Sequence, residues 1–141
     1  MFLDKYKITS FDNFQLNKNI IQKLKRLCFD IPNTVLYGCN NIGKYTLLKC
    51  LLSEIYSKEI YNSKKFNFKI FTNNSYKEII VDVSNYHYEI YLNTYCYNDK
   101  QSLNELLSSI SDNININTLS YTIILIKNAQ YLSTDNLQCI K

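Results

Sequence analysis

Gly38, Gly43 and Lys44 are the residues whose types and spacing point most clearly to chemistry, because they fit the pattern Gly-x4-Gly-Lys. The chain contains only 2 glycines, and both stand in this pattern. In such a loop the backbone amides wrap around a phosphate and the lysine adds a positive charge. An apolar segment, residues 34–37, precedes the loop, and an amphipathic helical pattern covers residues 47–56. A phosphate-binding loop between a buried strand and a helix is therefore predicted.

The loop departs from the strict pattern at two places. The residue after the lysine is normally Ser or Thr, whose hydroxyl binds Mg²⁺, but here it is Tyr45, and Thr46 follows one place later. Asn41 stands where such loops usually carry another glycine. Because asparagine adopts positive φ more readily than most residues, the loop is expected to keep its fold. The alternative is a chance match within a strand, a turn and a helix of no function.

The predicted phosphate contacts come from this loop and the start of the following helix. They are Gly38, Cys39, Asn40, Asn41, Ile42, Gly43, Lys44, Tyr45 and Thr46. Because the side chains between the two glycines carry no charge, the backbone amides are expected to make most of these contacts. A phosphate chain, such as that of ATP or ADP, is the ligand class that this arrangement suits.

A second apolar segment, residues 121–126, suits a central strand of a parallel sheet that is covered on both faces. In ATPases with a phosphate-binding loop, such a strand ends in Asp, often Asp-Glu, which orders Mg²⁺ and activates the attacking water. Here the two positions are Lys127 and Asn128, and neither is a carboxylate. A lysine balances phosphate charge but cannot position a metal. We therefore predict no catalytic residue, no metal ligand and no ATP hydrolysis.

Length and composition limit the remaining possibilities. A chain of 141 residues is one domain at most, and a hydrophobic content of 46% is enough for a globular core. The net charge of +4 permits an acidic partner such as DNA without requiring one. The 5 cysteines form no Cys-x-x-Cys pair, and their odd number predicts reduced thiols in an intracellular protein. No apolar run is long enough to suggest a membrane-spanning helix.

Apolar spacing predicts the other elements of an α/β chain. Lys and Arg gather on the polar face of the first expected helix, where contact with DNA and simple solvation are both open. The expected elements are, in order, a helix that Asn17 or Asn19 caps and that runs to about Cys28, the strand 34–37, the helix after the loop, a hairpin of 66–71 and 77–83, a strand 86–92, a helix from Asp99 or Ser102 that buries Leu103, Leu106, Leu107 and Ile110, the strand 121–126, and a last helix from Ser133 or Thr134.

His87 is the only histidine, and two interpretations of it are possible. A catalytic histidine needs a nucleophile and an orienting carboxylate, and the sequence spacing indicates no Cys, Ser or carboxylate that completes such a triad. Because side chains alternate along a strand, His87 is expected to share a face with Glu89 and Tyr91. A structural histidine within the strand is the preferred interpretation.

Four stretches of the sequence together resemble one family. Residues 2–8, Phe-Leu-Asp-Lys-Tyr-Lys-Ile, look like its opening Trp-Val-Asp/Glu-Lys-Tyr-Arg-Pro, and residues 36–46 look like its Leu-Tyr-Gly-Pro-x-Gly-x-Gly-Lys-x-Thr. Residues 84–90, Ser-Asn-Tyr-His-Tyr-Glu-Ile, resemble a Ser-x-Tyr-His-hydrophobic-Glu strand, and residues 128–133 align with an eroded acidic motif. The chain thus resembles the small subunits of replication factor C, the sliding-clamp loader of the AAA+ family. Its motifs are most like those of the subunit 3 type.

The resemblance implies an α/β fold, with a P-loop AAA+ ATPase core whose parallel sheet is flanked by helices. Residues 1–141 would be the N-terminal portion of that ATPase domain, and the family's lid and collar would lie beyond them. By the same resemblance Tyr6 and Lys7 lie near the adenine, and the helix near residues 99–111 faces the sliding clamp.

The implied function is that of a non-hydrolysing subunit in a heteropentamer that loads the clamp onto primed DNA during replication. ATP or ADP would be a structural ligand, and whether Mg²⁺ accompanies it is left open. The implied partners are other clamp-loader subunits, the sliding clamp and, through the assembled complex, primer-template DNA, but no membrane. The implied location is a nucleus in a cellular eukaryote, or a viral replication compartment.

An independent P-loop NTPase or nucleotide kinase is the alternative function. Such an enzyme needs a carboxylate near Mg²⁺, and the sequence supplies none at positions 127 and 128. A downstream Ser-Arg-Cys motif and an all-helical collar in the reading frame would favour the clamp loader, whereas measurable turnover would favour the enzyme.

Overall fold

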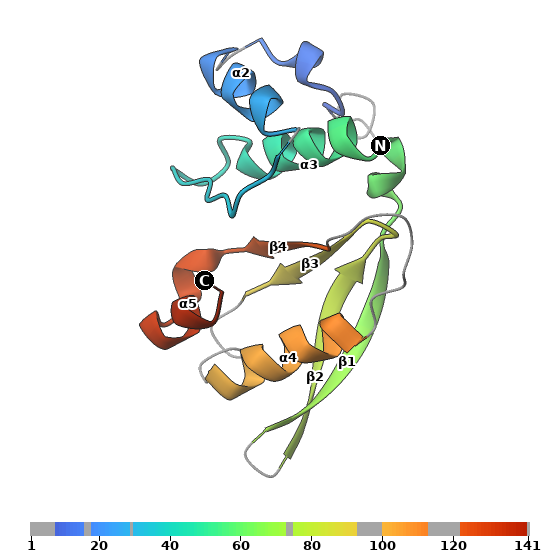
Figure 1. Cartoon of the computed structure of the whole chain (residues 1–141), viewed down its shortest axis with the longest axis vertical. Coiled ribbons are helices and arrows are strands. Elements are labelled where there is room, and N and C mark those ends of the chain that lie inside the picture. The colour runs from blue at the N-terminus through green and yellow to red at the C-terminus, as the bar shows by residue number, and fades with distance from the viewer. Residues whose placement is uncertain are drawn as a thin grey trace. The chain divides into compact units, whose positions relative to one another are not determined.

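A computed structural model describes residues 8–15, 18–28, 30–72, 75–92, 100–112 and 122–140. The chain forms two compact units, Met1–Asn62 and Ser63–Lys141 (Figure 1). Tyr6 and Lys7, which are predicted to lie near the adenine, fall outside the described residues. No helix within the described ranges is both long and apolar enough to span a membrane.

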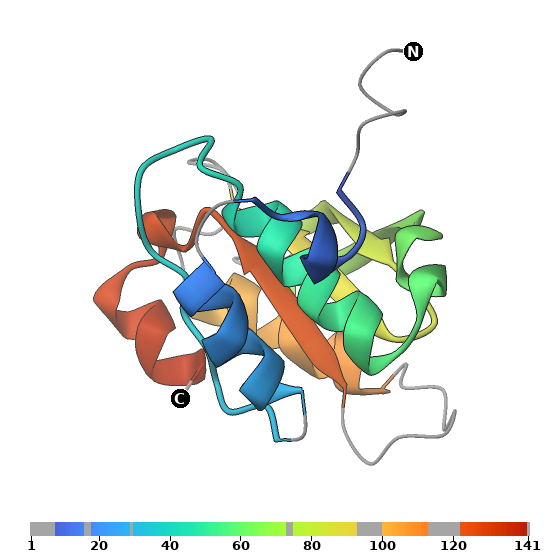
Figure 2. The ribbon, with the colours of Figure 1, turned by 90° about the horizontal axis from the view of Figure 1, so that it is seen from above.

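The regular elements described in the first unit are all helices. They are η1 (Phe11–Asn13), α2 (Lys18–Leu27), α3 (Lys44–Ile55) and η2 (Lys58–Tyr61), and an irregular segment with the loop joins α2 to α3. The helix predicted to end near Cys28 is confirmed as α2, because Ile21 and Leu24 recur at helical spacing and are buried. These two side chains pack with Phe11 of η1 and with the apolar face of α3. Figures 1 and 2 show α2 lying alongside α3.

The prediction of a buried strand at residues 34–37 is wrong. This segment has no regular secondary structure, and Val35 and Tyr37 are 79% and 92% exposed. A strand is stable only where a neighbouring strand satisfies its backbone hydrogen bonds, and the described part of the first unit contains no strand that could pair with this segment. The apolar pattern was therefore a necessary condition for a strand but not a sufficient one.

The second unit contains one sheet, whose described strands follow the order β1-β2-β3-β4. The strands are β1 (Lys64–Thr72), β2 (Ser75–Val83), β3 (His87–Tyr91) and β4 (Ile123–Lys127). The α/β class and the β1–β2 hairpin are confirmed. The sheet is mixed rather than parallel, because β1–β2 and β2–β3 pair antiparallel and β3–β4 pairs parallel. Short connections produce the antiparallel pairs, whereas the crossover through α4 (Lys100–Asp112) permits the parallel pair.

The core of the second unit lies between α4 and one face of the sheet. Figure 1 shows α4 lying across that face. Glu105 of α4 also reaches the edge of the sheet, where its Oε2 accepts a hydrogen bond from the Phe71 amide of β1 at 3.0 Å. The fully or almost fully buried members of this core are Ile70, Ile79, Val81, Ile90, Leu92, Leu103, Leu106 and Ile110.

The prediction that residues 121–126 form a central strand needs correction. Tyr121 lies outside the described residues, and β4 pairs with β3 alone among the described strands. Leu125 is buried, but its four neighbours in β4 are only partly buried. The last helix, α5 (Thr134–Ile140), confirms the prediction of a helix from Ser133 or Thr134. Leu132, before this helix, and Ile140, at its end, pack against the core.

Candidate nucleotide-binding site

The loop before α3 has the backbone geometry that its residue types predict. Gly38, Asn41 and Gly43 have φ angles of 144°, 61° and 87°, all in the region that L side chains rarely adopt. At Gly38 an added Cβ would also come within 2.8 Å of Ile42 Cδ1. Two glycines and one asparagine thus occupy the three positions of unusual backbone, and the prediction for Asn41 is confirmed.

Lys44 folds back across this loop. Its ammonium Nζ donates to the carbonyl oxygens of Gly38 at 2.9 Å and Cys39 at 2.5 Å. The first hydrogen bond along α3 runs from Leu47 N to Gly43 O at 2.9 Å, so the Lys44 amide projects from the helix N-terminus. The positive end of the helix dipole, the loop amides and one ammonium group therefore lie together, which is a suitable arrangement for an anion.

The remaining predicted contacts differ in their exposure. The loop between the two glycines is exposed, Tyr45 is also exposed, and Thr46 is half-buried. No acidic residue stands in the first turn of α3. The structure brings the described members of the predicted set into one loop and one helix start. Their contact with a nucleotide remains a prediction.

A buried chain of polar side chains crosses the second unit from the loop before β3 to the end of β4. Ser84 Oγ lies 2.5 Å from His87 Nδ1, and His87 Nε2 lies 2.9 Å from Glu89 Oε1. The other carboxylate oxygen, Glu89 Oε2, lies 2.6 Å from Lys127 Nζ. His87 and Glu89 are only 1% and 3% exposed. We call these four residues the Ser84–Lys127 chain.

The Ser84–Lys127 chain corrects the interpretation of His87 in part. The sequence spacing indicates no Cys, Ser or carboxylate that completes a catalytic triad, yet Ser84 and Glu89 lie beside the two ring nitrogens of His87. The role is nevertheless structural, because the group is buried and Ser84 Oγ also accepts the amides of Tyr86 at 3.2 Å and His87 at 3.0 Å. The Ser84 hydroxyl is thus engaged in hydrogen bonds to the backbone of the turn before β3. The alternation that puts His87 and Glu89 on one face was the signal available in the sequence.

The end of β4 carries charge of the opposite sign to the carboxylates of a hydrolytic site. The Lys127 ammonium is neutralised by Glu89 from the adjacent strand. Asn128 adopts a φ of 59°, and its Nδ2 donates to Leu92 O at 3.4 Å. Both side chains thus have structural partners within their own unit.

Comparison with known proteins gives a consistent result. No family model matches the sequence. Human replication factor C subunit 3 is 26% identical over 141 aligned positions, which cover 96% of this chain and 40% of that protein. A putative replication factor C small subunit of Acanthamoeba polyphaga mimivirus is 32% identical over 108 positions, covering 75% of this chain and 29% of that protein. Replication factor C subunit 5 of Saccharomyces cerevisiae is 30% identical over 116 positions, covering 79% and 32%.

The chain is similar to replication factor C small subunits. The resemblance drawn from its motifs is confirmed. The chain spans about two fifths of the length of the subunit 3 relative, and less of the other two. The whole-protein functions of replication factor C are therefore proposals for this chain.

A feature that the resemblance to replication factor C did not reveal lies along α3, directly after the loop. Lys49 is buried, with only 5% of its surface exposed, and its Nζ donates to Ile60 O at 3.1 Å. The same ammonium lies 5.9 Å from the ring centroid of Tyr45 and 5.4 Å from that of Tyr61. Two aromatic faces and a carbonyl thus stabilise a buried cation. The spacing of Tyr45 and Lys49, four residues apart on a helix, was the only sequence signal.

The phenol and the thiol near Lys49 resist ionisation. Burial raises the pKa of Tyr61 to about 12, and the neighbouring Cys50 thiol contributes to the rise. Burial also raises the pKa of the Cys50 thiol, although a hydrogen bond with Tyr61 opposes this. Both groups are therefore neutral at pH 7, and Cys50 is a weak nucleophile.

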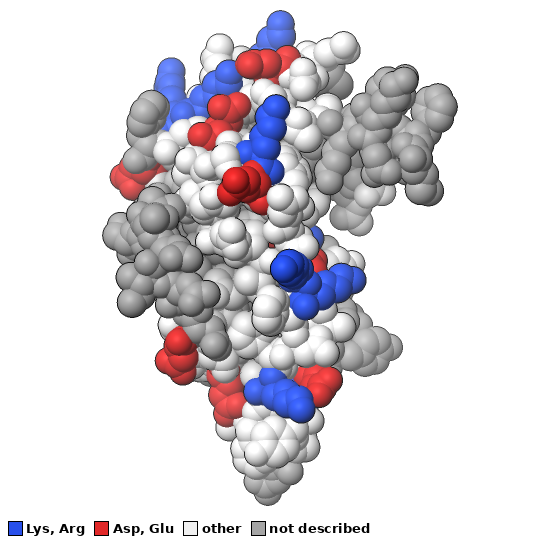
Figure 3. All heavy atoms as spheres, turned by 90° about the vertical axis from the view of Figure 1, so that its right-hand side faces the viewer, with Lys and Arg blue, Asp and Glu red and all other residues white. Residues whose placement is uncertain are grey.

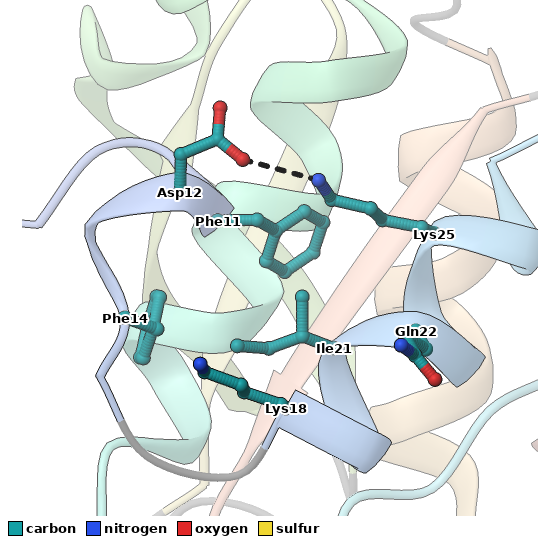
Figure 4. Close-up of a pocket in the computed structure, with 7 residues that line it drawn as sticks. All are labelled: Phe11, Asp12, Phe14, Lys18, Ile21, Gln22 and Lys25. Atoms are coloured by element: carbon teal, nitrogen blue, oxygen red, sulfur yellow. Dashed lines mark hydrogen bonds and ion pairs between the residues drawn. The ribbon is translucent and has the colours of Figure 1, made fainter.

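Two further features of the described residues bear on a second site, namely the surface charge and a hollow beside α2. On the face shown in Figure 3, acidic and basic side chains alternate rather than gather into one basic patch. A hollow of about 240 Å³ lies beside α2, where Asp12 pairs with Lys25 at 3.2 Å above Phe11 and Ile21 (Figure 4). This volume is below the range of about 300–1,000 Å³ that is usual for small-molecule sites. None of the residues that line the hollow belongs to the loop of residues 38–46, and we assign no function to the hollow.

Proposed function

We propose that this chain is part of a non-hydrolysing clamp-loader subunit, whose AAA+ domain keeps ATP or ADP at the loop of residues 38–46. The observation that carries the proposal is the Lys127–Glu89 ion pair at the end of β4, in a chain similar to replication factor C small subunits. A lysine bound to a buried carboxylate replaces the acidic pair on which hydrolysis depends. The same sequence keeps the loop that captures phosphate.

Nucleotide binding and hydrolysis draw on different groups. Anion capture uses the loop amides, the start of α3 and the Lys44 ammonium, whose present acceptors are carbonyls of the loop itself. Hydrolysis needs an ordered metal ion and an oriented water molecule, both of which carboxylates supply. Lys127 and Asn128 supply neither, so the proposed role of the nucleotide is structural. Tyr6 and Lys7 are proposed to complete the adenine side.

The proposed partners follow from the names of the relatives, which are subunits of one replication factor. We propose that the full-length protein assembles with other clamp-loader subunits into a heteropentamer, and through it engages the sliding clamp and primer-template DNA. The α4 helix would face the clamp, where Gln101, Asn104 and Ser108 are exposed. The assembly would act in a nucleus or at a viral replication site.

Co-purification tests the assembly. The full-length protein, co-expressed with other clamp-loader subunits of the same organism, should elute with them as one complex in gel filtration. The Leu106→Asp variant, which places a charge in the core beneath α4, is the folding-deficient control and should not elute with them. A correctly folded protein that elutes alone beside a complete loader would contradict the proposal.

A further inference from the structure

Mg²⁺ normally accompanies nucleotides in loops of this pattern, and the donor atoms around this loop do not fit it. Mg²⁺ requires an octahedral set of oxygen ligands at about 2.0–2.1 Å, usually with one or two carboxylates. Residues 38–46 contain no Asp or Glu. The position that should offer a Ser or Thr hydroxyl is Tyr45, whose oxygen stands at the far end of a ring rather than on Cβ.

The ring of Tyr45 is also committed to another partner. Its centroid lies 5.9 Å from Lys49 Nζ, and that ammonium is fixed by its hydrogen bond to Ile60 O. A side chain that stabilises a buried cation cannot also turn toward a metal at the loop without losing that contact. Thr46, the next hydroxyl along, is rotated by about 100° around the helix axis and faces a different direction.

The second usual source of metal ligands is equally unsuited. At the end of β4, Lys127 Nζ is bound to Glu89 Oε2 at 2.6 Å, and the other oxygen of Glu89 lies 2.9 Å from His87 Nε2. The Asn128 amide is bound to the Leu92 carbonyl. Lys127 and Asn128 therefore offer an ammonium group and an engaged amide at a position where a metal site needs carboxylate oxygens.

We infer that the loop binds the phosphate chain of a nucleotide without Mg²⁺, and that Lys44 and the backbone amides alone balance its charge. This inference rests on the proposed function, because it concerns the same ligand in the same loop. Lys44 must leave the carbonyls of Gly38 and Cys39 to reach the phosphate, and it can then act as the local counter-charge.

Calorimetry of the full-length protein with ADP, once in excess Mg²⁺ and once in excess EDTA, tests the inference. The dissociation constants in the two buffers should agree within about twofold. Weaker binding in EDTA by about tenfold or more, equivalent to about 1.4 kcal/mol, would overturn the inference while leaving nucleotide binding intact. If Lys44→Ala leaves the titration unchanged in both buffers, the proposed function itself fails, and the inference fails with it.

Tyr45→Phe sharpens the test, because it removes the phenolic oxygen and keeps the ring over Lys49. If the phenol were a metal ligand, this variant would lose affinity in Mg²⁺ but not in EDTA. The inference predicts that the ratio of the two dissociation constants is the same as in the unchanged protein. A loss confined to the Mg²⁺ buffer would overturn it. Thermal melting of the variant without nucleotide establishes that it is folded.

Discussion

The loop before α3 and the end of β4 are the two places where a phosphate-loop ATPase concentrates its chemistry, and this chain treats them differently. The loop has three positive φ angles, a backbone geometry that suits the wrapping of a phosphate. At the strand end Lys127 and Asn128 stand where such ATPases carry carboxylates, and the Lys127 ammonium is neutralised by Glu89. We therefore propose that nucleotide binding, which depends on the backbone, persists here, whereas hydrolysis, which depends on carboxylate side chains, does not.

The two places also differ in how much the rest of the protein depends on them. Lys44 is bound to the carbonyls of its own loop, and its exchange affects few other groups. Lys127 is bound to a buried carboxylate that also contacts His87, so its exchange affects two strands and a turn. The comparison therefore predicts functional effects at the loop and stability effects at the strand end.

Lys127→Ala should have the largest effect on stability. It removes the ammonium that faces the buried Glu89 carboxylate, and breaking a buried pair in this way costs about 3 kcal/mol of unfolding free energy. Lys69→Ala, which breaks the exposed Lys69–Glu78 pair, is the matched control and should cost about 0–1 kcal/mol. Urea denaturation measures both values.

A double variant tests whether the loss of stability comes from the unpaired Glu89 carboxylate. Lys127→Ala combined with Glu89→Gln should recover part of the lost stability, because the double variant buries no unpaired carboxylate. Equal losses for Lys127→Ala and Lys69→Ala would show that the Ser84–Lys127 chain is not a stabilising feature.

Gly38→Ala should have an intermediate effect on stability and should also weaken nucleotide binding. The φ of 144° disfavours any side chain, and the new Cβ would meet Ile42 Cδ1, so a cost of about 1–3 kcal/mol is expected. At Gly43 an added Cβ meets nothing within 4 Å, so Gly43→Ala should cost less, about 1–2 kcal/mol from its positive φ alone. Denaturation curves of the two variants give the order, and a greater cost at Gly43 would contradict this account of the loop.

Tyr61→Phe should have the smallest effect on stability, and the pH-dependent part of that effect should appear only at alkaline pH. The pKa of Tyr61 is raised to about 12 in the folded state, so its contribution to stability is fully present below pH 10, the ordinary value. It is lost as the pH rises from 10 to about 12, because the unfolded chain releases this proton first. The variant should therefore lose less stability than the unchanged protein in that window. Tyr76→Phe, at an exposed tyrosine of β2, is the control, and identical profiles for all three proteins would contradict the prediction.

Local patterns explain what the sequence could predict. Apolar spacing located α2 and the β1–β2 hairpin, and the residue types of Gly38, Asn41 and Gly43 predicted the unusual backbone of the loop. Each of these depends on residues close together in the chain. The family resemblance rested on the same kind of short motif.

Three features that the sequence did not predict involve partners further along the chain. The segment 34–37 has the composition of a strand, but composition does not indicate whether another strand is available to pair with it. The Lys127–Glu89 contact depends on the parallel pairing of β3 with β4, which a crossover sets. The burial of Lys49 depends on a carbonyl and a ring contributed by η2. A period of two or of 3.6 residues contains none of this information.

Nucleotide binding without hydrolysis is the central claim, and one paired measurement tests it most directly. Calorimetry gives the affinity of the full-length protein for ATP, and phosphate release under single-turnover conditions gives the rate of hydrolysis. We expect ATP binding that Lys44→Ala weakens, together with phosphate release at the level of a protein-free control, unchanged in Asn128→Ala. Phosphate release above that control that disappears in Lys44→Ala would show that the loop serves an active hydrolytic site, and would contradict the account.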